Sequence, residues 1–279
     1  MSYARPERGP RETGPLLGLA IWSLFFLWLF FFSPMVAAVG ALIPGSDSLL
    51  WTFLLTALRF LPLWLMAWFT PRLFGRSPRS LIRAGGSFDS GWLAIGFGSW
   101  FGLSILVSAV EWLLSPGDFA LTFSWTNAAL SLVVALLVFP LQTSAEELVF
   151  RGLIPQALGR AVRADWLLAL ISGLFFAVPH LLNPEAVGAP LLALVAYGSL
   201  GAAWSYAVLR TGGLEVALGA HLANNIFALS IVGYENSALP SVAIWTTPAV
   251  ALGQEAVKAV AGGLVWLLAV SWLQRRRAR

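Results

Sequence analysis

The sequence predicts an all-α, polytopic membrane protein with about eight transmembrane helices, and three observations support this fold class. Hydrophobic residues make up 58% of the 279 residues and charged residues only 11%, whereas soluble domains usually carry about 25% charged residues. The mean hydropathy is +0.80. Apolar stretches near the roughly 20 residues that a spanning helix needs recur along the chain, and none shows the alternation expected of a strand.

Eight apolar segments predict the helices. They are 16–43, 49–70, 91–114, 128–158, 165–183, 187–209, 213–232 and 251–273. The first and the fourth segments are longer than a bilayer is thick, so we expect them to tilt, kink or extend beyond it. The first segment follows positive residues, as a signal peptide does, but it is too long for one and is interpreted as an uncleaved anchor.

The domain organisation is simple. Residues 1–14 are polar and contain proline and glycine, which predicts a disordered tail. Residues 15–274 predict a single membrane-embedded helical domain, and residues 275–279 a basic tail. Small residues at helical spacing on the sixth segment would let a neighbouring helix approach closely. They are Gly198, Gly201, Ala202 and Ser205.

The arginines indicate how the chain is oriented, because they fall on both tails and on alternate loops. They are Arg5, Arg8, Arg11, Arg72, Arg76, Arg79, Arg83, Arg160, Arg163, Arg210, Arg275, Arg276, Arg277 and Arg279. The opposite loops hold only Lys258. The positive-inside rule then predicts that both termini are cytoplasmic. The pI of about 10.1 is therefore attributed to topology and anionic lipid headgroups, and no nucleic-acid partner is expected.

Ionisable side chains concentrate on three of the apolar segments. The fourth segment contains Pro140 and then the adjacent carboxylates Glu146 and Glu147. Glu147 and Arg151 are four residues apart, so they share a helix face in the favourable order for an ion pair. Glu146 points about 100° away, which leaves it available as a general base. The alternative is that both glutamates are ordinary interfacial charges at a cytoplasmic helix end.

Both histidines of the chain lie in the other two segments. Phe176 and His180 share a face of the fifth segment, and His221 and Asn225 share a face of the seventh. Taken alone, each histidine is explained by packing, and Asn225 by a hydrogen bond between helices. Their coincidence with the glutamates favours a catalytic centre inside the helix bundle, because buried ionisable groups in membranes mark functional sites.

The three motifs together resemble a known family. EExxxR (Glu146, Glu147, Arg151), FxxxH (Phe176, His180) and HxxxN (His221, Asn225) occur in this order on successive apolar segments. This pattern resembles the CPBP family of intramembrane glutamic endopeptidases, also called the CAAX protease and bacteriocin-processing family, which includes the Ras-converting CAAX endopeptidase. The resemblance covers about residues 128–232, and the eight-helix count fits the family fold.

The resemblance implies a hydrolase mechanism without a cofactor. It implies that Glu146 activates a water molecule with help from His180, and that His221 and Asn225 form an oxyanion hole. Glu147 and Arg151 would support the site. Amide hydrolysis requires these parts, a base for water and donors for the developing oxyanion. The implied substrate is a membrane-bound or lipid-attached protein, and the implied location is a bacterial plasma membrane.

One geometric difficulty accompanies this assignment. If the fifth segment starts at the cytoplasmic surface with Asp165, His180 lies roughly 22 Å along a straight helix. Glu146 is expected nearer the cytoplasmic half of the membrane. For the two side chains to hold one water molecule, the fourth segment must be displaced at its kink, or the fifth must begin outside the membrane.

Other functions use the same residues. A glutamate and two histidines can bind zinc in a metallopeptidase, although Leu181 and Leu222 follow the histidines, so HExxH is absent. A bacteriocin self-immunity protein or membrane scaffold would need no bond cleavage. A transporter would use Glu146 as a proton site. Other charged residues interrupt apolar segments outside this pattern, and for Arg59 a buried pair or snorkelling is expected. Arg59 interrupts the second segment, Glu111 lies near the end of the third, and Glu215 lies near the start of the seventh.

Overall fold

Helices lie at all eight predicted positions in the part of the chain that the structure describes. The computed structural model describes residues 2–7, 14–42, 49–238, 242–249 and 251–277. The helical segments are α1–η1–α2 (Gly14–Leu27, Trp28–Phe32, Ser33–Ala41), α3 (Leu49–Leu73), α4 (Ser90–Leu114), α5–η4–α6–η5–α7 (Trp125–Val133, Val134–Val138, Phe139–Glu146, Glu147–Leu153, Ile154–Leu158), α8 (Asp165–His180), α9 (Pro190–Thr211), α10 (Glu215–Ser230) and α11 (Leu252–Arg277). The all-α polytopic fold class is therefore confirmed.

Two of the eight helices are shorter than a typical membrane span. Six described helices are long and apolar enough to cross a bilayer: Ile21–Ala41, Trp51–Leu73, Ser90–Leu114, Trp125–Leu158, Pro190–Thr211 and Leu252–Arg277. By contrast, α8 and α10 have 16 residues each, or about 24 Å. Segments predicted as spans thus include two short helices, which carry His180 and His221.

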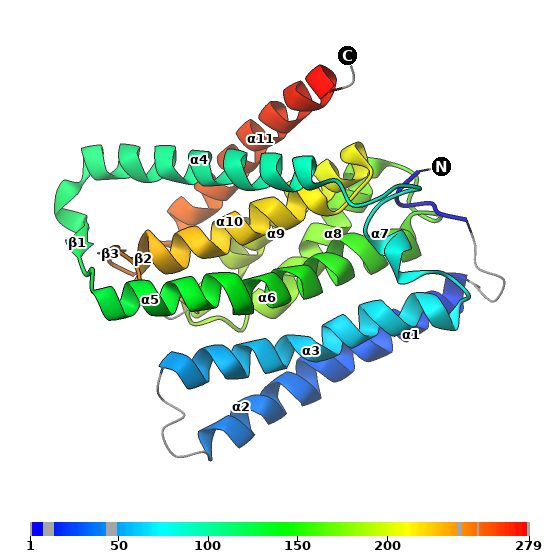
Figure 1. The fold of residues 1–279 in the computed structure, drawn as a ribbon, viewed down its shortest axis with the longest axis horizontal. Helices are drawn as coiled ribbons and strands as arrows, with labels where there is room; N and C mark the ends of the chain where they lie inside the picture. The colour runs from blue at the N-terminus through cyan, green and yellow to red at the C-terminus, as the bar shows by residue number, and fades with distance from the viewer. Residues whose placement is uncertain (1, 8–13, 43–48, 239–241, 250, 278–279) are drawn as a thin grey trace.

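The helices pack side by side as one bundle. Figure 1 shows α4, α10 and the rod formed by α5 and α6 running in roughly the same direction, with the α1–α3 hairpin along one side. Helix α8 packs on α9, α10 on α4, and α11 on α9. The N and C labels both lie toward the end of the bundle opposite the small sheet, so the two termini share one end.

Three π-helical segments widen the long helices, and each ends two residues before a proline. They are η1, η4 and η5, which precede Pro34, Pro140 and Pro155. A proline inside a helix lacks an N–H group, and its ring clashes with the carbonyl one turn earlier. A local switch to i→i+5 hydrogen bonds makes room for this ring. The kink expected at Pro140 is therefore a widened turn, η4. A second widened turn, η5, contains Glu147 and Arg151.

Glycines allow two close helix crossings that fix the helices carrying the histidines. A Cβ atom on Gly173 of α8 would lie 2.4 Å from the Gly198 oxygen of α9, and one on Gly201 would lie 2.8 Å from Gly173 Cα. The close approach expected at the small residues of the sixth segment is confirmed. A Cβ atom on Gly96 of α4 would lie 2.0 Å from the Val216 oxygen of α10, so α10 is held equally closely.

The end of the bundle that holds the termini is closed by polar contacts. Buried Glu215, at the start of α10, accepts hydrogen bonds from Arg83 Nε (2.8 Å) and from the Asp89 amide (2.9 Å). Arg277, at the end of α11, pairs with Asp89 at 3.2 Å. Glu215 thus has a structural role, because it anchors the loop before α4 against α10.

Parts of both tails are among the described residues. Within residues 2–7, Tyr3 and Ala4 are buried, and Tyr3 donates a hydrogen bond to the Leu81 carbonyl (2.5 Å). Arg5 binds the Gly159 carbonyl (2.8 Å) and Asp165 (3.1 Å). The rest of the predicted disordered tail, residues 8–13, lies outside the described residues. The basic end is helical through Arg277, since α11 continues past the apolar segment.

A small sheet lies at the opposite end of the bundle. Strand β3 (Trp245–Thr247) pairs antiparallel with β1 (Ala120–Leu121) and parallel with β2 (Val232–Tyr234). These strands have two or three residues, too few to show an alternating pattern in the sequence. At the same end Lys258 pairs with Glu111 (2.6 Å) and with Glu255.

Candidate active site

Two carboxylates lie at the junction of α6 and η5, in the interior of the bundle. Glu146 is the last residue of α6 and Glu147 the first of η5. The exposed fractions of these residues are 4% and 0%. They follow a turn that is polar on its buried side, with Gln142 and Thr143. The Oε2 atom of Glu146 and the Oε1 atom of Gln142 have no hydrogen-bond partner among the described residues.

Glu147 forms the ion pair that its spacing predicts. Its Oε1 atom lies 2.9 Å from Arg151 NH1, and both side chains are almost fully buried. The guanidinium carbon of Arg151 lies 4.0 Å from the centre of the Phe176 ring. Removing either partner would leave an uncompensated charge in the protein interior, which is strongly unfavourable. Glu147 is therefore committed to a structural contact.

His221 lies between the two carboxylates. Its Nδ1 atom is 2.8 Å from Glu147 Oε1, and its Nε2 atom is 3.5 Å from Glu146 Oε2. Because a carboxylate only accepts, the contact with Glu147 places a proton on Nδ1 and turns Nε2 toward Glu146. The Trp204 and Phe176 rings pack on the imidazole at 4.9 and 5.7 Å between ring centres. Sequence reasoning missed the Glu147–His221 contact, since it joins helices far apart in the chain.

His180 enters the same aromatic cluster from α8. Its Nδ1 atom contacts the Phe176 carbonyl oxygen at 2.7 Å, so Nδ1 donates and Nε2 presents a lone pair. The Phe176 ring lies 4.5 Å from the His180 ring and also touches His221. In the described part of the chain, His180 and Glu146 form no ion-pair contact within 4.0 Å. A water molecule that bridges the two side chains therefore stays a prediction.

Asn225 lies one helical turn after His221 and is 5% exposed. Its side-chain oxygen accepts a hydrogen bond from Asn224 Nδ2 at 3.2 Å, and Asn224 in turn accepts one from Trp100 Nε1 at 3.2 Å. With its oxygen engaged in this way, the amide NH2 group of Asn225 is the part that can donate to another molecule.

The three motifs are therefore brought together by helix packing, and the arrangement places acid–base groups in a largely apolar interior.

Arg59 is not part of this arrangement. Its Nε atom is buried with no hydrogen-bond partner among the described residues, and no described ion pair includes it, so the expected buried pair is not observed. Among the described residues, no group of three or more His, Asp or Glu side chains is arranged to hold a metal ion.

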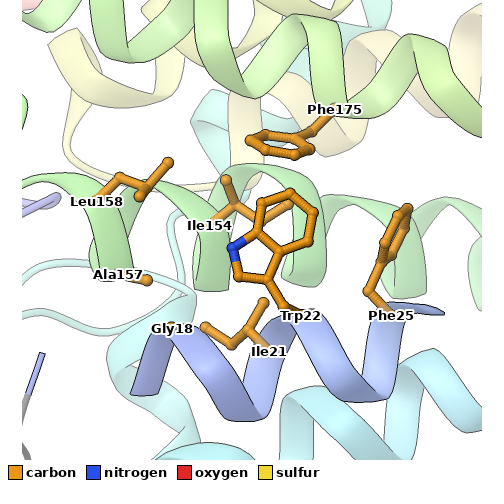
Figure 2. A pocket seen from close by; sticks show the side chains of 8 residues that line it. All are labelled: Gly18, Ile21, Trp22, Phe25, Ile154, Ala157, Leu158 and Phe175. Atoms are coloured by element: carbon orange, nitrogen blue, oxygen red, sulfur yellow. The ribbon is translucent and has the colours of Figure 1, made fainter. Parts of the chain in front are cut away.

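An apolar hollow lies beside the site but does not contain it. Figure 2 shows its lining residues between α1, α7 and α8, with the Phe175 ring next to the Trp22 ring at 4.5 Å between ring centres. It is lined by Gly18, Ile21, Trp22, Phe25, Ile154, Ala157, Leu158 and Phe175 and has an empty volume of about 330 Å³. No ionisable side chain lines it, so this hollow offers nothing for acid–base chemistry.

The family comparison covers the part of the chain that carries the three motifs. Residues 125–227 match the model of the family described as type II CAAX prenyl endopeptidase Rce1-like. This central segment, which we call the Rce1-like segment, is similar to that family. The Rce1-like segment begins with α5 and ends inside α10, so it includes both glutamates, both histidines and Asn225. The family resemblance that the motifs predict is thereby confirmed.

The chain is also similar to a bacterial protein whose name describes it as uncharacterized. YyaK of Bacillus subtilis (strain 168) is 34% identical over 172 residues, which are 61% of this chain and 58% of YyaK. The alignment therefore spans little more than half of that relative. No solved structure matches the chain.

Proposed function

We propose that this protein is an intramembrane peptidase that cleaves a membrane-bound or lipid-attached protein, with Glu146 as the base that activates water. The Rce1-like segment supports a peptidase in general. The observation that carries the assignment is the different surroundings of the two glutamates. Glu147 is engaged through Oε1 by Arg151 at 2.9 Å and by His221 at 2.8 Å, whereas the one described ion-pair contact of Glu146 is the longer one of Oε2 with His221, at 3.5 Å. The Oε2 atoms of both glutamates are buried and have no hydrogen-bond partner among the described residues.

In the proposed reaction, Glu146 and His180 hold the attacking water molecule. The water oxygen bonds to the carbonyl carbon of the substrate as its proton passes to Glu146, while the Nε2 lone pair of His180 orients the water. The carbonyl becomes an oxyanion. When the tetrahedral intermediate collapses, the C–N bond breaks and the proton held by Glu146 passes to the leaving amine. The products are a carboxyl terminus and an amino terminus.

The oxyanion is stabilised by donors from α10. The amide NH2 group of Asn225 donates one hydrogen bond, and Nε2 of His221 donates a second when it carries a proton. Glu147 holds Nδ1 of the same ring. With that second proton, the buried group of Glu146, Glu147, Arg151 and His221 has no net charge. Removing one oxyanion donor from an enzyme typically lowers the rate by roughly 10²–10³-fold.

The substrate is proposed to approach through the bilayer. The six described helices that can cross a membrane support a multi-pass location, and we propose the bacterial plasma membrane with both termini cytoplasmic. The proposed partners are the lipid bilayer and a membrane-bound or lipidated protein substrate, and the mechanism uses no cofactor.

The test is a comparison of newly formed peptide ends in membranes from cells that carry different variants. The strains carry the wild type, Glu146→Gln, Glu111→Gln or no protein. Glu111→Gln is the matched control, since it makes the same chemical change in a carboxylate at the far end of α4. We expect a set of ends in the wild type and Glu111→Gln that is missing in the other two strains.

Two results would contradict the proposal. Peptide ends that are the same in all strains, with Glu146→Gln still correcting any defect of the deletion, would indicate an immunity or scaffold role. Ends that persist in Glu146→Gln but disappear in the deletion would show a peptidase that does not use Glu146 as its base.

A further inference from the structure

A second buried polar cluster adjoins His180 outside the three motifs. Glu185 lies in a short 3-10 turn, η6 (Pro184–Ala186), and is 5% exposed. It accepts hydrogen bonds from the Tyr197 hydroxyl and from Asn183 Nδ2 (3.0 Å) through Oε1, and from the Ala238 amide (3.0 Å) through Oε2. We call Asn183, Glu185 and Tyr197 the outer cluster.

Among the described residues, Glu185 of the outer cluster forms no ion pair, unlike the buried carboxylates Glu147 and Glu215. Glu147 is paired with Arg151, and Glu215 with Arg83. Glu185 is satisfied by neutral donors only. Burying a carboxylate in this way is costly. Oε2 holds the distant Ala238 amide, whereas Oε1 is directed to Tyr197 and Asn183. The cost is explained if the Glu185 carboxylate fixes the orientation of a neighbouring side chain.

Tyr197 is the link between this carboxylate and the active site. Its ring lies 4.3 Å from the His180 ring, at an angle of 30° between the ring planes. Its hydroxyl group is fixed twice, since it donates to Glu185 and accepts from Asn183 Nδ2 at 3.2 Å. Because its hydroxyl group is held in this way, the ring of Tyr197 cannot tilt freely.

His180 needs such a support, because its own hydrogen bond leaves one motion free. The contact of Nδ1 with the Phe176 carbonyl fixes the proton on Nδ1, but the imidazole plane can still rock about that contact. It is also the last residue of α8, one position after Pro179. Tyr197 on one side and Phe176 on another restrict this rocking.

We propose that Tyr197 is a positioning residue that holds His180 in the orientation needed to guide water, and that Glu185 and Asn183 fix Tyr197. This inference rests on the proposed peptidase function. Tyr197 acts through His180 and touches neither substrate nor water. Changes in it therefore affect the chemical step and leave substrate binding unchanged.

The kinetic test compares variants of the outer cluster in the full-length protein. Tyr197→Leu removes the ring, and kcat is expected to fall about 10- to 100-fold because a small displacement of a catalytic group has effects of this order. Tyr197→Phe keeps the ring and loses one hydrogen bond, so kcat is expected to fall only about 2- to 10-fold. KM stays unchanged in both. Tyr206→Leu, further along α9, is the matched control with wild-type kcat.

A double-variant cycle tests the role of Glu185. If Glu185 acts through the Tyr197 hydroxyl, Glu185→Ala combined with Tyr197→Phe lowers kcat no more than the larger single change. Additive losses would show that Glu185 acts by another route and would overturn that part of the inference.

A spectroscopic readout separates this inference from the peptidase proposal. The chain has only two histidines, so nitrogen-15 histidine labelling gives two ring signals, which His221→Gln assigns. The wild type is expected to show His180 protonated on Nδ1 alone, and Tyr197→Leu to show averaged ring nitrogens. This measurement does not require enzymatic activity. If Tyr197→Leu folds poorly, Tyr197→Phe can be measured in its place, because it is expected to show the same change of the His180 signals in part.

The outcomes distinguish the two proposals. An active wild type, an inactive Glu146→Gln and a fully active Tyr197→Leu with unchanged ring signals would overturn the role of Tyr197 and leave the peptidase proposal standing. A wild type without peptidase activity, together with the predicted change of the His180 signals, would keep the positioning contact and remove the function it serves.

Discussion

At the scale of single residues, the site depends on two neighbouring glutamates with different tasks. Glu147 bonds to both Arg151 and His221, so it sets the position of a histidine on a helix far away in the chain. Glu146 lies farther from the second nitrogen of that histidine, at 3.5 Å. The residue with more contacts is thus expected to matter for stability, and the residue with fewer contacts for chemistry.

The two glutamates are therefore expected to differ in thermal unfolding. Glu147→Gln removes the ion-pair partner of Arg151, and breaking a buried pair costs about 3–5 kcal/mol. Its unfolding temperature in detergent should fall by several degrees or more. Glu146→Gln should unfold within about a degree of the wild type while losing activity. Equal unfolding temperatures for the two variants would show that Glu147 has no special structural role.

At the scale of helices, close crossings at glycine decide where the histidines lie. Gly96 of α4 faces the Val216 oxygen of α10, whereas the space around Gly98 on the same helix is open. Gly96→Ala should push α10 away and lower both the unfolding temperature and the activity. Gly98→Ala is the matched control and should be neutral or stabilising by up to about 1 kcal/mol, since alanine favours a helix. The prediction fails if the two alanine variants behave alike.

The widened turn η5 offers a second test at this scale. Pro155 ends the run of π-helical bonds that contains Glu147 and Arg151. Pro155→Ala restores an N–H group and favours ordinary i→i+4 bonds, which would rotate Glu146 relative to His221. Activity should fall at least about tenfold, while the unfolding temperature should not fall. Full activity in Pro155→Ala would show that the widened turn does not set the geometry of the site.

At the scale of the whole molecule, both termini lie at one end of the bundle and the small sheet at the other. The chain contains no cysteine, so single cysteines can be introduced without background. Ser2→Cys and Gln274→Cys should be labelled by an impermeant reagent only after the cytoplasmic side is opened. Phe123→Cys, beside β1, should be labelled in intact cells. Labelling of Ser2→Cys and Gln274→Cys from opposite sides would contradict the proposed topology.

Much of this architecture follows from local sequence patterns. Hydropathy predicts the eight helices because the bilayer requires long apolar segments whose backbone is hydrogen-bonded internally. The Glu147–Arg151 pair follows from helical spacing. The contacts missed by sequence reasoning join different helices, as in Glu147 with His221 and His180 with Tyr197. No periodicity encodes such contacts. The docking of Tyr3 was missed for the same reason, since its partner Leu81 lies beyond α3.

The most direct test of the central claim is cleavage by the purified full-length protein in liposomes, with a substrate identified from the peptide ends. The account predicts that the wild type cleaves equally well with and without a strong metal chelator and that Glu146→Gln does not cleave at all. Cleavage by Glu146→Gln at the wild-type rate, or cleavage that the chelator abolishes and zinc restores, would contradict it.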